Sequence, residues 1–214
     1  MSGSRPPVFF DLDGTLTDSS AGIVGSLRHA IGRAGIPVPD DDLNWLIGPP
    51  IRNSLATLVG PEREEQVFAY YRERYDERGW RENEPYEGIR DLLEQITAHG
   101  IPAYVATAKP TVFAKRILEH FDLGRYFIEI FGSELDGTRT RKDELLRWAR
   151  AKMKMEGPGV MIGDRRYDIE AGRANGLHAV GVTWGFGSRD ELVDAGAHAI
   201  VDAPATLATM LATA

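Results

Sequence analysis

The sequence places two aspartates, Asp11 and Asp13, at the end of a short apolar run near its start. Residues 8–12 are expected to form a buried strand, because the run is short, apolar and bounded by Pro and Gly. Side chains two positions apart in a strand share a face, so both acids would point into one pocket while Leu12 turns to the core. A carboxylate can attack phosphorus covalently, and a second carboxylate can move the proton at the leaving oxygen. The alternative is that both acids are turn residues before Gly14.

Polar residues also follow two later apolar runs. The first run starts at residue 103 and ends in Thr107, Ala108 and Lys109, and the second, at 160–162, is followed by Asp164 and then Asp168. Ligands of open α/β sheets bind beyond the carboxyl ends of the strands, so we expect all these side chains to converge with Asp11 and Asp13.

Four carboxylates in one place need positive charge. Two of them about 4 Å apart repel by roughly 4 kcal/mol at an effective dielectric of about 20, so the cluster requires a cation or shared protons. Oxygen ligands without His or Cys suit a hard ion such as Mg²⁺. Taken alone, Asp164 is equally well interpreted as a helix N-cap, with Asp168 as an acid of the first turn. A calcium loop of the EF-hand type does not fit, because its glycine and final acid positions fall on Leu16 and Gly22.

The segment DGTRTRKDELL adds cations at a helix start. Thr140 and Asp143 resemble a capping arrangement, so a helix is expected to begin there. Arg139, Arg141 and Lys142 then crowd its N-terminus, where the helix dipole disfavours positive charge. We interpret the two arginines as solvated and assign Lys142 to the carboxylate cluster, which would offset the penalty.

The rest of the pattern predicts the α/β class, with a doubly wound and mostly parallel sheet covered on both faces. Expected helices at 89–98, 112–120, 142–152 and 167–174 alternate with expected strands at 103–107, 127–131, 160–162 and 179–182, followed by a short helix near 191 and a strand at 199–201. Residues 19–80 instead show helical periodicity interrupted by Gly and Pro, without a convincing strand. We therefore expect a core formed by residues 1–16 and 85–214, with an all-helical insertion at 17–84 that joins it near 16–18 and 83–85.

Composition restricts the function classes. The 214 residues are 43% apolar, carry a net charge of −7 and include no cysteine. The negative charge argues against a nucleic acid polymer or an anionic membrane as partner. No run approaches the roughly 20 apolar residues of a membrane span, and the absence of cysteine favours a reducing compartment, so the expected location is cytoplasmic.

The motifs resemble those of the haloacid dehalogenase-like hydrolases. DLDGT, the Thr of VATAK, the Lys of TRKDEL and GDRRYD occur in the order of the four motifs of that superfamily. The likeness extends over nearly the whole chain and includes the insertion, which resembles the superfamily's helical cap on a Rossmann-like core. The stretches DGTRTRKDEL and WGFGSRDELVDAGA look most like the phosphoglycolate phosphatase and 5′-nucleotidase branch.

The resemblance implies a role for each motif residue. Asp11 would be the nucleophile that forms an aspartyl-phosphate, and Asp13 the acid that protonates the leaving alcohol and then the base that activates water. Thr107 and Lys142 would hold phosphate oxygens. The resemblance also implies that Gly14, Thr15 and Ala108 lie at the phosphate. It implies that the Mg²⁺ ion is bound by Asp11, Asp164, Asp168 and the backbone carbonyl of Asp13. Relatives often carry Asn or Ser where this chain has Ala108, so only its N–H would meet phosphate.

The implied activity is Mg²⁺-dependent hydrolysis of a small phosphomonoester, of the phosphoglycolate or nucleoside 5′-monophosphate type. The alternatives are a sugar-phosphate mutase and a non-catalytic receiver-like domain. The expected partner is a small phosphorylated metabolite, and the expected assembly is a monomer or homodimer. Cleavage of a carbon–phosphorus bond is disfavoured, because Lys109 is the first lysine of the chain and the insertion holds none. A dehalogenase would need neither the acid at Asp13 nor Mg²⁺.

Residues of the insertion are harder to assign. Arg52, in the loop IGPPIRNSL, is the candidate for a second substrate contact, with an exposed surface position as its alternative. The tyrosines at 70, 71 and 75 are interpreted as core of the insertion. The loop at 184–187 is interpreted as a plain turn, with a position beside the pocket as its alternative.

Overall fold

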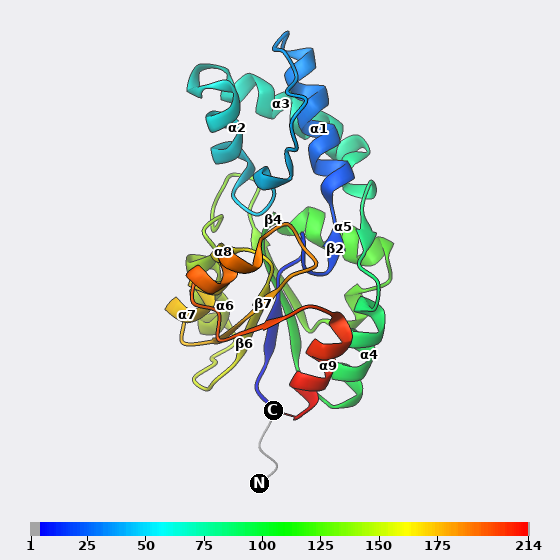
Figure 1. Cartoon of the computed structure of the whole chain (residues 1–214), viewed down its shortest axis with the longest axis vertical. Coiled ribbons are helices and arrows are strands. Elements are labelled where there is room, and N and C mark those ends of the chain that lie inside the picture. The colour runs from blue at the N-terminus through cyan, green and yellow to red at the C-terminus, as the bar shows by residue number, and fades with distance from the viewer. Residues whose placement is uncertain (1–4, 214) are drawn as a thin grey trace.

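A six-stranded parallel sheet forms the centre of the molecule in this computed structural model, which describes residues 5–213 (Figure 1). The strand order is β5-β4-β1-β6-β7-β8, and every neighbouring pair is parallel. The strands are β1 (Val8–Phe10), β4 (Ala103–Pro110), β5 (Glu129–Ser133), β6 (Val160–Gly163), β7 (His178–Val182) and β8 (Ala199–Val201). The first strand is therefore central, which explains why its three residues are all buried.

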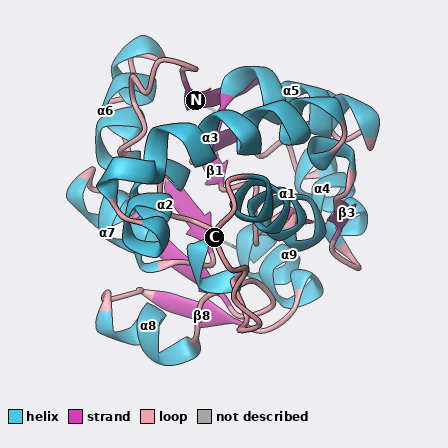
Figure 2. Ribbon diagram, turned by 90° about the horizontal axis from the view of Figure 1, so that it is seen from above, coloured by secondary structure: helices cyan, strands magenta, loops and turns pink. Residues whose placement is uncertain are grey.

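Helices cover both faces of this sheet (Figure 2). They are α4 (Ile89–Ala98), α5 (Thr111–His120), α6 (Lys142–Lys152), α7 (Arg166–Ala174), α8 (Arg189–Asp194) and α9 (Pro204–Thr213). Alternate residues of β1 serve the two layers: Phe10 packs in one cluster with α4, α5 and α9, and Phe9 packs in another with α6 and α7. The α/β class and the doubly wound, mostly parallel sheet expected from the sequence are confirmed.

A group of helices lies beyond the carboxyl ends of the strands (Figure 1). It comprises α1 (Ser20–Arg33), α2 (Ile51–Val59), α3 (Pro61–Glu77) and the short 3-10 turns η1 (Asn44–Leu46) and η2 (Gly79–Arg81). These helices bury an apolar cluster of their own, to which α5 adds Phe113. Two short antiparallel strands, β2 (Thr17–Asp18) and β3 (Glu84–Pro85), stand where the chain enters and leaves this group. We propose that residues 17–84 are a cap on a core of 1–16 and 85–214, and use these names below.

Several elements differ from the sequence expectation in detail. The strand expected at 127–131 is displaced to Glu129–Ser133, because Phe127 closes a 3-10 turn (η3, Gly124–Tyr126) by donating its N–H to the Gly124 carbonyl oxygen at 3.2 Å. Helix α6 does begin near the expected residue, but the capping arrangement of Thr140 was wrong. Arg141 is the N-cap, without a side-chain cap, since Asp143 instead forms an ion pair with Arg141 at 3.1 Å.

Candidate active site

The loop after β1 turns tightly beneath the cap. The Leu12 carbonyl oxygen accepts hydrogen bonds from the N–H groups of Leu16 and Thr17, at 2.9 and 3.0 Å. Gly14 has a φ of +85°, and a Cβ there would overlap the Asp164 carboxylate. The loop from β1 can therefore lie against the loop from β6 only because this position is glycine.

Three carboxylates meet where these loops touch. Asp11, Asp164 and Asp168 are all buried, and one oxygen from each lies within 4.8 Å of the others. Lys142 enters from the first residue of α6, with Nζ 2.9 Å from Asp11 Oδ1 and in contact with Asp168. The structure thus brings together residues that are more than 150 positions apart, and it places Lys142, but neither neighbouring arginine, among the acids.

The electrostatics show that one lysine does not balance this cluster. Burial, reinforced by repulsion from Asp168 and Asp11, raises the pKa of Asp164 to about 8. Burial also raises the pKa of Asp168 to about 6, although the attraction of Lys142 opposes it. Burial alone would lower the pKa of Lys142, but attraction by Asp11 and Asp168 outweighs it and raises that pKa. The raised pKa values mean that Asp164 and Asp168 retain protons in the folded protein, and a bound divalent cation would replace these protons.

The donor set fits Mg²⁺. All candidate ligands are oxygens, and a hard cation of this kind is bound by one or two carboxylates together with water and substrate phosphate. Asp11, Asp164 and Asp168 are the residues that could hold it. The side chain of Asp13 lies outside the group of three, so a contact through its backbone carbonyl remains a prediction.

The loop at 184–187 forms one wall of this site, so its interpretation as a plain turn was wrong and the alternative, a position beside the pocket, is the one observed. The Phe186 N–H donates to Asp164 Oδ2 at 2.8 Å, and Trp184 Nε1 donates to the Thr15 carbonyl oxygen at 3.0 Å. Thr15 also donates its hydroxyl to Asp164 Oδ1 at 3.2 Å. Asp164 is therefore oriented from two sides, one of which the sequence pattern did not reveal.

Lys109 lies beside Asp13, as its place at the end of strand β4 predicted, but the sequence analysis gave it no functional role. Its Nζ lies 3.0 Å from Asp13 Oδ2 and donates to the Tyr75 hydroxyl at 2.7 Å. The other Asp13 oxygen, Oδ1, is buried and accepts no hydrogen bond from residues 5–213. The spacing contained a signal, because Lys109 follows Thr107 by two positions in the same strand and therefore shares its face. Thr107 itself is buried, and its Oγ1 accepts the Lys109 N–H at 3.2 Å.

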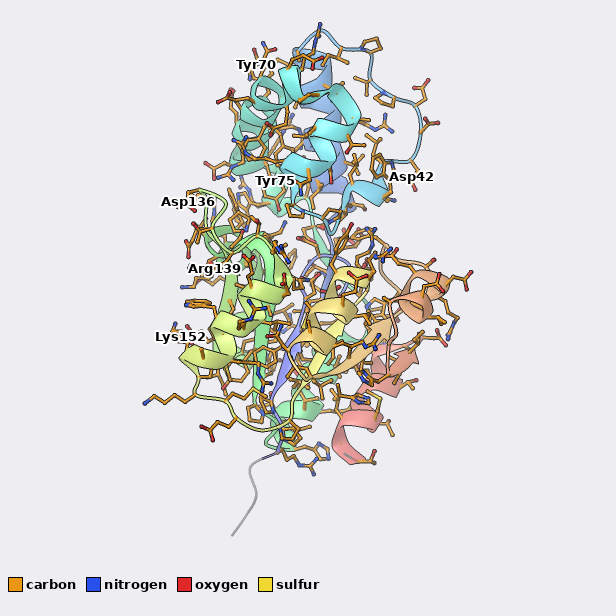
Figure 3. All side chains as sticks on the ribbon, turned by 90° about the vertical axis from the view of Figure 1, so that its left-hand side faces the viewer. Asp42, Tyr70, Tyr75, Asp136, Arg139 and Lys152 are labelled. Atoms are coloured by element: carbon orange, nitrogen blue, oxygen red, sulfur yellow. The ribbon has the colours of Figure 1, made fainter. Side chains whose placement is uncertain are left out.

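A cavity of about 90 Å³ opens between the cap and the core. Its floor includes Asp11, Asp13, Thr107, Ala108 and Lys109, and its roof and sides include Ile47, Pro49, Tyr71, Arg72, Tyr75 and Phe113. Figure 3 shows Tyr75 at the end of the cap that faces the core. Tyr71 and Tyr75 thus belong to the buried cluster of the cap, as expected, and also line the cavity.

Arg52 lies at an exposed surface position, which was the alternative interpretation of this residue. Its guanidinium pairs with Glu64 at 3.1 Å and lies 4.1 Å from the centre of the Phe68 ring, and its side chain is 54% exposed. It does not line the cavity. Substrate binding by Arg52 stays a prediction that no contact within residues 5–213 supports.

A second contact joins cap and core beside the acids. Arg165 directly follows Asp164, donates its N–H to Asp168 Oδ2 at 3.0 Å, and donates Nη1 to the carbonyl oxygen of Ile47 in the cap. Its Nε also donates to Glu191 at 2.9 Å. The cap loop is thereby attached to the residue between two of the candidate metal ligands.

A parallel α/β sheet, an acidic cluster beyond its strand ends and a helical insertion over that cluster define the class of protein. Residues 8–182 match the family model of the haloacid dehalogenase-like hydrolases, and the chain belongs to that family of enzymes. No helix among residues 5–213 has the length and apolar character that a membrane crossing requires.

Relatives and solved structures agree with this assignment. A 5′-nucleotidase from Pseudomonas aeruginosa is 44% identical over 87% of this chain and 86% of its own length. Tyrosine-protein kinase PtkA from Mycobacterium tuberculosis is 40% identical over 94% of this chain and 69% of its own, and a phosphoglycolate phosphatase from Agrobacterium fabrum is 33% identical over 85% and 82%. The crystal structure of a predicted phosphatase from Clostridium acetobutylicum superposes with a TM-score of 0.93 at 40% identity, covering 99% of this chain and 100% of that one.

Proposed function

We propose that this enzyme is a Mg²⁺-dependent phosphatase that hydrolyses a small phosphomonoester through an aspartyl-phosphate on Asp11. The observation that carries the proposal is the contact of Asp11 with Lys142 beside two further buried acids, with Asp13 facing the same cavity. Family membership and relatives named as phosphatases support it.

The chain's own residues divide the chemistry between two carboxylates. Lys142 holds Asp11 Oδ1, so the other oxygen of Asp11 attacks phosphorus as the bond to the leaving oxygen breaks. Asp13 gives its proton to that leaving oxygen, and then takes a proton from the water that hydrolyses the aspartyl-phosphate. Thr107 and Lys142 bind the phosphoryl oxygens. Mg²⁺, held by Asp11, Asp164 and Asp168, would supply positive charge for the transferring phosphoryl group.

The cavity favours a short substrate, because its volume is only about 90 Å³. A two-carbon phosphomonoester is of this size. A nucleoside monophosphate is much larger and would bind only with the cap displaced, so a phosphoglycolate-type ester is the first candidate and a nucleotide the second.

The specific alternative to hydrolysis is transfer of the phosphoryl group to a hydroxyl of a second substrate instead of to water. The relative named as a tyrosine-protein kinase shares 40% of the residues, and a phosphoaspartate can pass its phosphoryl group to a hydroxyl as well as to water. A sugar-phosphate mutase would differ in the same way. A receiver-like domain is excluded by the family match.

The test is a phosphate-release assay with phosphoglycolate, nucleoside 5′-monophosphates and sugar phosphates, with Mg²⁺ and with a chelator. The expected result is multiple turnover that requires Mg²⁺ and needs no acceptor other than water. Acid quench during turnover is expected to trap a hydroxylamine-sensitive phosphoenzyme. Turnover without any phosphoenzyme, or phosphoryl transfer only to an added sugar or tyrosine hydroxyl, contradicts the proposal. Assembly as a monomer or homodimer and a cytoplasmic location remain predictions.

A further inference from the structure

Arg72 is a cap cation that faces the cavity without an acidic partner. It lies on α3, is half-buried, and lines the cavity that contains Asp11 and Asp13. Its guanidinium carbon lies 5.5 Å from the centre of the Phe68 ring and 5.3 Å from that of Phe113. Among residues 5–213 it forms neither an ion pair nor a hydrogen bond that meets the usual geometric limits.

Within residues 5–213, Arg72 differs from other cap arginines in that it both lacks an acidic partner and lines the cavity. Arg33, Arg52 and Arg74 each pair with a glutamate, at 2.7, 3.1 and 2.9 Å respectively. A guanidinium carries five N–H donors, so the half-buried Arg72 has donors to offer a ligand in the cavity. The carboxylates in the cavity floor do not serve it, since Asp11 is held by Lys142 and Asp13 by Lys109.

The helix holds Arg72 in a defined orientation. Phe68, Arg72 and Tyr75 follow one another at spacings of four and three residues and therefore lie along one face of α3. Phe68 belongs to the cap and Phe113 to α5 of the core, so the guanidinium lies between aromatic rings from both parts. Because these rings already restrict the guanidinium, Arg72 would lose less conformational freedom on binding a ligand.

We propose that Arg72 binds a carboxylate of the substrate, and that the substrate is a short phosphomonoester carrying this second anionic group. The inference rests on the proposed function, because the phosphoryl end must lie at Asp11 for the other end to reach the cap. A planar guanidinium matches a carboxylate through two parallel hydrogen bonds. The small volume of the cavity favours a short spacer between the two anionic groups.

The test compares phosphoglycolate with ethyl phosphate, which has the same carbon chain and no carboxylate. Arg72→Gln is expected to raise KM for phosphoglycolate by about 10- to 100-fold, the usual effect of losing a charged hydrogen bond, with kcat little changed. Its kinetic constants for ethyl phosphate are expected to stay within about twofold of wild type. Arg72→Lys keeps the charge and is expected to recover part of the loss.

Arg33→Gln is the matched control. Arg33 also stacks on an aromatic ring, 4.2 Å from the centre of Tyr70, but it pairs with Glu73 and does not line the cavity. This variant is expected to behave as wild type with both esters. An equal loss with both esters in Arg72→Gln, or no loss with either, overturns the assignment of Arg72.

A binding measurement separates this inference from the proposed function. Calorimetry on Asp11→Asn, with and without Arg72→Gln, titrates the same two esters in the absence of turnover. The expected result is tighter binding of phosphoglycolate than of ethyl phosphate, and loss of that preference when Arg72 is replaced. If wild type hydrolyses none of the phosphomonoesters in the phosphate-release assay, the proposed function fails while this preference still decides the role of Arg72. A preference that survives Arg72→Gln overturns the inference even if both esters are hydrolysed.

Discussion

Lys109 holds Asp13 in place, with its Nζ 3.0 Å from Asp13 Oδ2. The same ammonium donates to the hydroxyl of Tyr75, which belongs to α3 of the cap. The residue proposed as the acid and base of the reaction is therefore connected to the cap through a single side chain. Placement of the cap and orientation of the acid are expected to be coupled.

Tyr75→Phe tests this coupling. The variant keeps the ring contacts with Tyr71 and Phe113 but removes the oxygen that accepts from buried Lys109. Leaving that donor with one partner fewer is expected to cost about 1 to 3 kcal/mol, seen as a decrease in kcat of about 5- to 100-fold and an altered pH–rate profile. The control is Tyr70→Phe, which removes a cap hydroxyl that accepts from Gln66 Nε2 at 3.4 Å, away from the cavity, and should change neither quantity. Identical behaviour of the two variants would separate Tyr75 from the acid.

Asp11→Asn is expected to abolish turnover, by at least about a thousandfold, because an amide oxygen does not form the acylphosphate. The fold should persist, since Lys142 retains its contact with Asp168. The measurement is phosphate release together with thermal unfolding. Asp42→Asn is the matched control, because Asp42 is exposed and its Oδ1 accepts only the Asn44 N–H, a role that asparagine keeps. Substantial residual turnover in Asp11→Asn would remove the nucleophile assignment.

Lys142→Met removes the only side-chain cation that contacts Asp11 within residues 5–213. Buried acids left without their partner typically cost about 3 to 5 kcal/mol, so the unfolding free energy should decrease by this amount and turnover should be lost. Added Mg²⁺ is expected to restore part of the stability. Lys152→Met is the control, since its ion pair with Glu129 is on the surface. A Lys142 variant as stable as the control would show that Lys142 does not stabilise the buried carboxylates.

The stability of the metal-free protein should depend on pH in a defined direction. The folded state raises the pKa of Asp168 to about 6 and of Asp164 to about 8, whereas both groups titrate near their ordinary value of 3.8 when unfolded. The folded state therefore retains protons that the unfolded chain has released, and the unfolding free energy decreases as pH rises from about 4 through 6 and 8.

Mg²⁺ replaces those protons, so the increase in melting temperature that it causes should grow between pH 6 and pH 8. The measurement is thermal unfolding with Mg²⁺ or a chelator at several pH values. Asp164→Asn serves as the reference, because it should lose the part of the pH dependence that lies nearest pH 8. An effect of Mg²⁺ that is independent of pH, or stronger at pH 6, would contradict the assignment of these residues to the ion.

Gly185→Ala tests the wall formed by the loop at 184–187. A Cβ at this position would overlap the Gly14 carbonyl oxygen and the Asp164 carboxylate. The loop must then move away from Asp164, and we expect both a loss of more than about 2 kcal/mol in unfolding free energy and reduced affinity for Mg²⁺. Gly157→Ala is the control, since a Cβ there meets nothing within 4 Å. A neutral Gly185 variant would mean that the loop does not support the site.

Much of this protein was determined by local features of its sequence. The apolar runs, the acids that follow them and the helical periodicity of residues 19–80 were sufficient to predict the parallel sheet, the group of helices after β1 and the convergence of Asp11, Asp164 and Lys142. Such features are local because strand and helix formation depend on the period of apolar residues, and because parallel strands end at one edge of a sheet.

Tertiary structure decided which side chains complete the site. Lys109 contacts Asp13, the loop at 184–187 donates to Asp164, and Arg72 instead of Arg52 faces the cavity. The spacing of apolar and polar residues does not specify these contact partners, because each contact depends on how separate loops and the cap lie against the core. The packing of α3 against α5 brings Phe113 beside both Arg72 and Tyr75, and this tertiary contact places Arg72 at the cavity.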